Sequence, residues 1–131
     1  KSVAGQFHAV GLLDEPKVIQ KKFSRAVTDS QREIVFDPER PGVTNLLTIY
    51  QVLSGETREA IEARFDGKGY GDLKKGLAEL VIESLAPIRK RYDELTADPA
   101  TLDQLLADGV ERARPVVETT MAQVRQAMGL R

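Results

Sequence analysis

A glycine-rich stretch in the middle of the chain holds the residues best suited to ligand chemistry. The stretch reads Gly67-Lys68-Gly69-Tyr70-Gly71, and Lys74 and Lys75 follow it. One interpretation is a linker between helices, in which glycine permits a positive φ. The other is a ligand-facing loop, because lysines in the first turn of a helix oppose the helix dipole and would be offset by a bound phosphate. The residues alone leave both interpretations open.

A second basic cluster, Arg89-Lys90-Arg91, lies further along the chain. Consecutive residues point in different directions around a helix, so the three side chains cannot all face one partner. With the basic residues nearer the N-terminus they could form a face that contacts phosphates, which would set affinity without reading a base sequence. The simpler alternative is a solvated surface. The earlier basic residues are Lys17, Lys21, Lys22 and Arg25.

The composition argues against several other kinds of site. The 131 residues contain no cysteine, and the only histidine is His8. We therefore expect no disulfide, no thiol nucleophile and no metal site. Carboxylate pairs such as Glu59 and Glu62 are typical of a solvated helix surface, and no nucleophile elbow or Walker loop is present. The net charge of −1 argues against bulk binding of DNA or RNA, but it permits a local basic face.

The sequence gives no indication of a membrane partner. No run of about 20 apolar residues is present, so we expect no membrane span. The opening residues Lys1-Ser2-Val3-Ala4-Gly5-Gln6 lack the apolar region of a signal peptide. We therefore expect a cytoplasmic protein.

Helices must position these side chains. Residues 1–13 show no periodicity and are expected to form a loop, after which Asp14 is the predicted N-cap and Pro16 lies in the first turn. The β-prone run Ile34-Val35-Phe36 is too short for a sheet. The apolar stripe of the first helix is predicted to be Ile19, Phe23 and Val27. Helical spacing predicts helices over residues 17–26, 43–54, 57–65, 73–95 and 102–128.

Caps and helix breakers refine this all-α prediction. Gly55 is expected to end a helix, and Asp98 to begin one. Pro87 should kink the long helix, and Gly109 and Pro115 should weaken the last helix enough to divide it in two. We expect a helical bundle in which the two longest helices pair as a C-terminal αα-hairpin.

The order of several short motifs is more specific than any one of them. In order, the chain carries Leu13-Asp14-Glu15-Pro16, Ala26-Val27-Thr28-Asp29-Ser30, Pro41-Gly42-Val43-Thr44-Asn45-Leu46-Leu47, Phe65-Asp66-Gly67-Lys68-Gly69-Tyr70-Gly71-Asp72-Leu73-Lys74, Pro87-Ile88-Arg89 and Ala127-Met128-Gly129-Leu130. With these motifs it resembles the carboxy-terminal portion of bacterial tryptophanyl-tRNA synthetases, which are class I aminoacyl-tRNA synthetases.

The resemblance implies a parent enzyme that activates tryptophan with ATP and Mg²⁺ and transfers it to tRNA(Trp). A KMSKS-type loop in the family binds the ATP phosphates, and Lys1 and Ser2 resemble its last two residues. Residues 1–13 would then be the end of that loop and a connector, and residues 14–131 a helical domain that binds tRNA and its anticodon. The family's Rossmann catalytic domain would precede Lys1, so this chain alone is expected to be inactive.

The resemblance also implies partners. The family forms homodimers in which one tRNA bridges both subunits. Lysine and arginine would hold backbone phosphates, and aromatic rings, of which Tyr70 and Tyr92 are expected to be the exposed ones, would stack on unpaired bases. The predicted tRNA-binding residues are Lys68, Tyr70, Lys74, Lys75, Arg89 and Arg91. The alternative is a helical protein–protein interaction module without RNA binding of its own.

Overall fold

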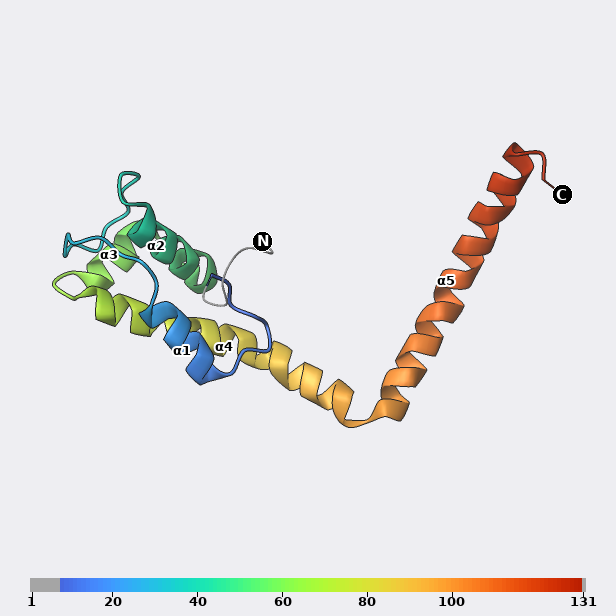
Figure 1. Cartoon of the computed structure of the whole chain (residues 1–131), viewed down its shortest axis with the longest axis horizontal. Helices are drawn as coiled ribbons and strands as arrows, with labels where there is room; N and C mark the ends of the chain where they lie inside the picture. Colours follow the sequence, from blue (N-terminus) through green and yellow to red (C-terminus); the bar gives the residue numbers. More distant parts are fainter. Residues whose placement is uncertain (1–7, 131) are drawn as a thin grey trace. The chain divides into compact units, whose positions relative to one another are not determined.

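Five helices account for the regular structure in the computed structural model, which describes residues 8–130 (Figure 1). They are α1 (Pro16–Ser24), α2 (Pro41–Ser54), α3 (Arg58–Phe65), α4 (Tyr70–Ala97) and α5 (Pro99–Ala127). The chain divides into two units, one ending at Arg89 and the other beginning at Lys90. The prediction of an all-α fold is confirmed.

The core of the first unit is built from one face of each of its four helices. Burial of these apolar faces is the main force that holds the short helices together. The rings of Tyr50 and Phe65 meet edge to face with 5.4 Å between their centroids, which joins α2 to the end of α3. The buried side chains are Ile19, Phe23, Ile34, Val43, Leu46, Leu47, Tyr50, Ile61, Phe65, Leu73, Leu77, Ala78 and Val81.

The N-cap of α1 lies one residue later than the sequence predicts. Its N-cap is Glu15, and Pro16 occupies the first helical position, where a missing N–H costs nothing. The prediction of Asp14 as the N-cap is wrong, because the Asp14 carboxylate accepts the Gly11 N–H at 2.7 Å and pairs with the Lys22 ammonium. Asp14 therefore fixes the connector against α1.

The apolar stripe of α1 is shorter than predicted. Ile19 and Phe23 are buried as expected, but the Val27 side chain is 83% exposed. The reason is that α1 ends at Ser24, so Val27 no longer follows the helical period. The segment between α1 and α2 then runs without regular structure, as the shortness of the β-prone run predicted, and Ile34 anchors it in the core.

Two of the predicted caps are confirmed. Gly55 ends α2 with a φ of 70°, a left-handed conformation that glycine adopts without strain. Asp98 begins α5, and its carboxylate accepts the Ala100 N–H at 3.1 Å. Thr57 caps α3 through its hydroxyl, which accepts the Ala60 N–H at 3.3 Å.

Neither internal proline ends a helix. The helix α4 continues through Pro87, and α5 continues through Gly109 and Pro115. The division of the last helix in two was therefore wrong, since proline removes only one backbone hydrogen bond of the many in a helix of 29 residues. No side chain of α5 is buried, so the predicted αα-hairpin of α4 and α5 stays a prediction. Among the described residues, no helix is both long and apolar enough to span a membrane.

Candidate nucleic-acid interface

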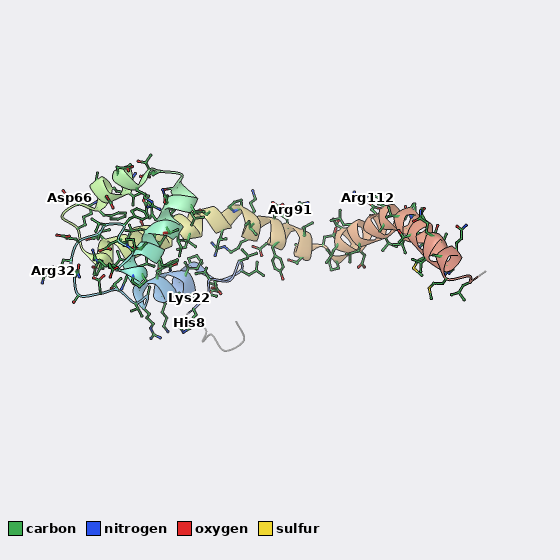
Figure 2. All side chains as sticks on the ribbon, turned by 90° about the horizontal axis from the view of Figure 1, so that it is seen from above. His8, Lys22, Arg32, Asp66, Arg91 and Arg112 are labelled. Atoms are coloured by element: carbon green, nitrogen blue, oxygen red, sulfur yellow. The ribbon has the colours of Figure 1, made fainter. Side chains whose placement is uncertain are left out.

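A cleft of about 950 Å³ opens at the end of the first unit where the segment before α2 meets the loop between α3 and α4. Figure 2 shows Arg32 and Asp66, one from each side of this cleft, at the same end of the unit. One wall is residues 32–35 and the other is the end of α3 with the glycine-rich loop. The lining residues are Arg32, Glu33, Ile34, Val35, Glu62, Ala63, Phe65, Asp66, Gly67, Lys68, Gly69 and Tyr70.

Arg40 and Asp29 hold the two walls of this cleft together. The Arg40 side chain is buried, and its guanidinium donates to both carboxylate oxygens of Asp29, Nε to Oδ2 at 2.9 Å and Nη2 to Oδ1 at 3.2 Å. Arg40 also donates to the Glu33 carbonyl at 2.7 Å, which fixes the segment that lines the first wall. The hydroxyl of Tyr70, the first residue of α4, accepts from Arg40 and donates to Asp29.

The contacts within this cluster set its ionisation. Hydrogen bonds from Arg40 and Tyr70 lower the pKa of Asp29 from 3.8 to about 2. Burial, and the hydrogen bond that the phenol donates to Asp29, raise the pKa of Tyr70 above 10.0. The hydrogen bond to Asp29 also raises the pKa of Arg40. Near neutral pH the cluster therefore holds an anionic carboxylate, a guanidinium cation and a neutral phenol, and none of them titrates there.

The start of α2 packs closely against the segment that carries Asp29. A Cβ on Gly42 would lie 2.7 Å from the carbonyl oxygen of Val27, so only glycine allows α2 to approach that closely. Thr44 ties the turn before α2, because its hydroxyl donates to the Asp37 carbonyl at 2.6 Å and accepts the Asp37 N–H at 3.1 Å. Three of the motifs in the sequence therefore meet at one place, since they supply Asp29, Gly42 and Tyr70.

Two of the predicted tRNA-binding residues line the cleft. The Lys68 side chain is exposed, and its ammonium lies 5.6 Å from the centroid of the Phe65 ring, within the range of a cation–π contact. Tyr70 is half-buried and its hydroxyl is held by Arg40 and Asp29, so the expectation that Tyr70 is an exposed aromatic is wrong. The other tyrosine expected at the surface, Tyr92, is 47% exposed.

Lys74 and Lys75 lie on the first turns of α4, directly after the loop. With Gly71 and Ala78 they line a second hollow of about 470 Å³, whose other side is formed by Gln20 and Ser24 of α1. This arrangement places the two lysines beside the glycine-rich loop, as the sequence suggested. Lys75 also lines a hollow that Lys68 shares.

Neither of the predicted arginines is among the residues that line the cleft. Arg89 donates through Nη1 to the carbonyl oxygen of Asp14 at 2.8 Å, so it fixes the connector to α4. Arg91 belongs to the second unit and lies 3.4 Å from a carboxylate oxygen of Glu94. Lys1 and Ser2, the predicted remnant of the ATP-binding loop, lie outside the described residues.

Sequence reasoning missed Arg40 and the role of Asp29. Arg40 is the N-cap of α2, where a positive charge opposes the helix dipole. The same argument that singled out Lys74 and Lys75 could therefore have singled out Arg40. Asp29 was part of a recognised motif, but nothing in the sequence indicates that it pairs with a residue 11 positions later.

The side chains that line the cleft could recognise a polar group. Arg32 and Lys68 supply donors, whereas Glu33, Glu62 and Asp66 supply acceptors. The Glu62 carboxylate already accepts the Phe36 N–H at 2.7 Å, which fixes its position. Among residues 8–130, no group of three or more His, Cys, Asp or Glu side chains could hold a metal ion.

Comparison with known proteins finds close relatives of this chain. A family model described as "tRNA synthetases class I (W and Y)" matches residues 1–86. The tryptophan–tRNA ligase of Helicobacter pylori strain J99 is 52% identical over 130 residues, which are 99% of this chain and 39% of the relative. The enzyme of the same name from Bacillus subtilis is 47% identical over 131 residues, again 99% and 39% of the two chains.

Two solved structures have the same fold. The tryptophanyl-tRNA synthetase of Mycoplasma pneumoniae superposes with a TM-score of 0.79 at 31% identity, over 99% of this chain and 40% of that one. The synthetase of Campylobacter jejuni gives a TM-score of 0.75 at 27% identity, over 98% and 41%. This chain spans about 39% of the length of the curated relatives described above. It belongs to the family of class I tRNA synthetases for tryptophan and tyrosine.

Proposed function

We propose that this chain is part of a tryptophan–tRNA ligase, an enzyme that activates tryptophan with ATP and transfers it to tRNA(Trp). The observation that carries the proposal is the 52% identity to a protein of that name across 99% of this chain. ATP with Mg²⁺, a Rossmann catalytic domain, a homodimeric assembly and a cytoplasmic location belong to the same proposal. The relatives' names do not favour the alternative of a protein–protein module.

The share of this chain in that activity is tRNA binding. Unpaired RNA bases are bound by contacts to their faces and edges, and the backbone is held by Lys and Arg. The cleft offers contacts to a base edge and to the backbone, since Arg32 and Glu62 can pair with the edge of a base while Lys68, which also lines the cleft, can hold a phosphate. Lys74 and Lys75 would hold the phosphates that follow along α4.

The Asp29–Arg40–Tyr70 cluster positions this surface without needing to touch RNA. It joins the first residue of α4 to the segment that forms the opposite wall, so the width of the cleft is fixed before a ligand binds. A preformed cleft lowers the entropic cost of ordering loops on binding. Tyr70 is therefore a positioning residue in this proposal, whereas Lys68 and Lys74 contact tRNA.

The other predicted role, binding of the ATP phosphates by Lys1 and Ser2, rests on the resemblance of these residues to the end of a KMSKS-type loop. A lysine ammonium would stabilise the charge that develops on the pyrophosphate. The residues of this chain cannot complete that site, so the 131-residue chain should show no tryptophan-dependent exchange between ATP and pyrophosphate. Exchange by the chain alone would contradict this division of labour.

The dependence of tRNA binding on salt tests the proposed role directly. Each phosphate that a lysine neutralises adds about 0.9 to the slope of log affinity against log salt. The double variant Lys68→Ala with Lys74→Ala should lower the magnitude of that slope by about two. The charge-matched control is Arg112→Ala with Arg114→Ala on α5, which should leave the slope unchanged. Equal losses in both variants would reject a specific interface on the glycine-rich loop.

A further inference from the structure

The connector is attached to the helices of the first unit by polar contacts that converge on Asp14. Its described part, residues 8–13, passes beside α4 before the chain enters α1 (Figure 1). The Asp14 carboxylate accepts the Gly11 N–H at 2.7 Å and pairs with the Lys22 ammonium on α1. The Asp14 N–H donates in turn to the Gly11 carbonyl at 3.1 Å. The connector therefore ends in a hydrogen-bonded turn that is tied to α1.

Arg89 attaches the same turn to a second helix. Asp14 precedes the N-cap Glu15, so its carbonyl oxygen lies outside the hydrogen-bond ladder of α1. Arg89 of α4 donates to this oxygen from Nη1 at 2.8 Å. Arg89 is half-buried, whereas Lys90 and Arg91, the next two residues of the basic triplet, are exposed. The three residues Arg89, Asp14 and Lys22 form what is called the latch below.

Apolar packing holds the connector less firmly than the latch does. Val10 packs against the edge of the core, but Leu12 and Leu13 are 58% and 50% exposed and bury little apolar surface. A hollow of about 380 Å³ lies between the connector and the helices, with Val10 and Leu12 on one side and Ile49 and Leu85 on the other. Close packing is lost across such a space. The polar contacts at Asp14 therefore determine where the connector lies.

The latch is charged near neutral pH. The hydrogen bond from Lys22 lowers the pKa of Asp14 below its ordinary value of 3.8. The side chains of Lys22 and Asp14 are only 12% and 22% exposed, so salt and water screen their attraction less than that of a surface pair. The latch is therefore a lasting support for the connector and not a switch that opens near neutral pH.

We propose that Arg89 is a positioning residue for tryptophan activation, because with Asp14 and Lys22 it fixes the connector that follows the ATP-binding loop. This inference rests on the proposed function, in which Lys1 and Ser2 end that loop. Arg89 itself touches neither ATP nor tRNA in this proposal. It acts through the backbone of the connector.

The connector is short enough to pass on a change of position. Six positions separate Ser2 from His8 in the sequence. A lysine that stabilises charge on pyrophosphate must be placed accurately, since a misplacement of about 1 Å can cost about 100-fold in rate. Release of the connector from α4 should therefore lower the rate of activation without changing any residue of the ATP site.

Hydrogen exchange on the 131-residue chain tests whether the latch holds the connector. Arg89→Ala should speed exchange of the Gly11 and Asp14 amides about ten-fold or more, because the turn opens more often. Lys90→Ala is the matched control, since it removes the neighbouring positive charge from a side chain that is 80% exposed. It should leave this exchange unchanged, and the Leu77 amide should be equally protected in all three chains. Unchanged exchange in Arg89→Ala, or equal increases in both variants, would overturn the latch.

Kinetics of tryptophan-dependent ATP–pyrophosphate exchange test the link to activation. In a chimera in which this chain replaces the matching part of the H. pylori relative, Arg89→Ala should lower kcat/KM for ATP about ten-fold or more. The KM for tryptophan should be unchanged, because the loop binds ATP phosphates and not the amino acid. Arg89→Lys keeps a cation that can donate to the same carbonyl, so its kcat/KM should lie between those of Arg89→Ala and the unsubstituted chimera. Lys90→Ala should match the unsubstituted chimera.

The affinity for tRNA separates this role from the tRNA contact that the sequence predicted for Arg89. Arg89 lies about 28 Å along α4 from Tyr70, which lines the cleft, so Arg89→Ala should leave tRNA affinity unchanged. Loss of tRNA affinity with normal kcat/KM for ATP would overturn the positioning role. Equal losses for ATP and tryptophan would also overturn it, because they would indicate general damage to the enzyme.

Failure of the proposed function would look different. The unsubstituted chimera would then show no tryptophan-dependent exchange, and the role of Arg89 in activation would fall with the ligase assignment. Hydrogen exchange would still report whether the latch holds the connector. An active chimera in which Arg89→Ala keeps its kcat/KM for ATP would overturn the positioning role alone.

Discussion

The Arg40 guanidinium donates hydrogen bonds to both carboxylate oxygens of Asp29, from Nε to Oδ2 at 2.9 Å and from Nη2 to Oδ1 at 3.2 Å. This pair joins the segment after α1 to the N-cap of α2, and the hydroxyl of Tyr70 connects it to the start of α4. Three separate parts of the chain are therefore fixed by one buried arginine. The proposed tRNA surface depends on this cluster for its shape.

Removal of the Tyr70 hydroxyl should weaken the fold. Tyr70→Phe leaves Arg40 without one acceptor and Asp29 without one donor, which should lower the free energy of unfolding by roughly 1–3 kcal/mol. The measurement is urea unfolding followed by circular dichroism. Tyr92→Phe is the control, because Tyr92 is 47% exposed, and its effect should stay within about 0.5 kcal/mol. Equal effects would show that the hydroxyl network contributes nothing.

Acid should remove the stabilisation that Asp29 provides. Its pKa is about 2 in the fold and 3.8 in the unfolded chain, so folding favours the carboxylate. The stabilisation is complete above about pH 4 and is lost as the pH falls through about 2. The stability difference between wild type and Asp29→Asn should shrink over this window. Three other acids have a lowered pKa: Asp14, Glu59 and Asp98. Because the wild type and the Asp29→Asn variant both contain them, their contributions cancel in the stability difference. A difference that stays constant to pH 2 would contradict the pairing.

Gly42 should not tolerate a side chain. A Cβ there would lie 2.7 Å from the Val27 carbonyl oxygen, so Gly42→Ala must push α2 away and should cost roughly 1–3 kcal/mol. Gly71→Ala is the matched control, because nothing lies within 4 Å of its Cβ. Thermal unfolding of both variants checks the prediction. Stability of Gly42→Ala equal to that of the control would mean that α2 is less closely packed than described.

Replacing a leucine by alanine should cost more stability the more deeply the leucine is buried. Leu77 is fully buried, and Leu77→Ala should cost roughly 2–5 kcal/mol because it leaves a cavity. Leu80 only packs against the edge of the core, so Leu80→Ala should cost less. Leu106→Ala on α5, where the side chain is 61% exposed, should change the stability of the first unit little. Urea unfolding of the three variants should give the largest loss of unfolding free energy for Leu77→Ala, a smaller one for Leu80→Ala and the smallest for Leu106→Ala.

The parts of the fold that local chemistry determines were predictable from sequence. Gly55 ends α2 and Asp98 begins α5 because each cap depends on one residue and its own neighbours. The prediction of Asp14 as a cap was wrong because its carboxylate accepts a hydrogen bond from Lys22, which lies eight residues away. Pro115 was given too much weight, since its local cost does not outweigh the helix on either side of it.

The candidate site was predictable only where its residues are contiguous. Lys68 and Tyr70 were recognised because they share one short loop with three glycines. The opposite wall, with Arg32, and the buried Arg40 come from a segment more than 25 residues earlier. Only the tertiary fold brings them together, so no spacing rule could have placed them. The contact of Arg89 with the Asp14 carbonyl was unpredictable for the same reason, because Asp14 is 75 residues away.

The most direct test of the tRNA-binding role separates charging from activation. A chimera in which this chain replaces the matching part of the H. pylori relative would carry Lys68→Ala with Lys74→Ala, and a second chimera would carry Arg112→Ala with Arg114→Ala. The first should lose about ten-fold or more in tRNA charging, which corresponds to about 1.4 kcal/mol, while its tryptophan-dependent ATP–pyrophosphate exchange is retained. The second should keep both activities. Equal losses of charging and exchange in the first chimera would contradict the assignment of these lysines to tRNA.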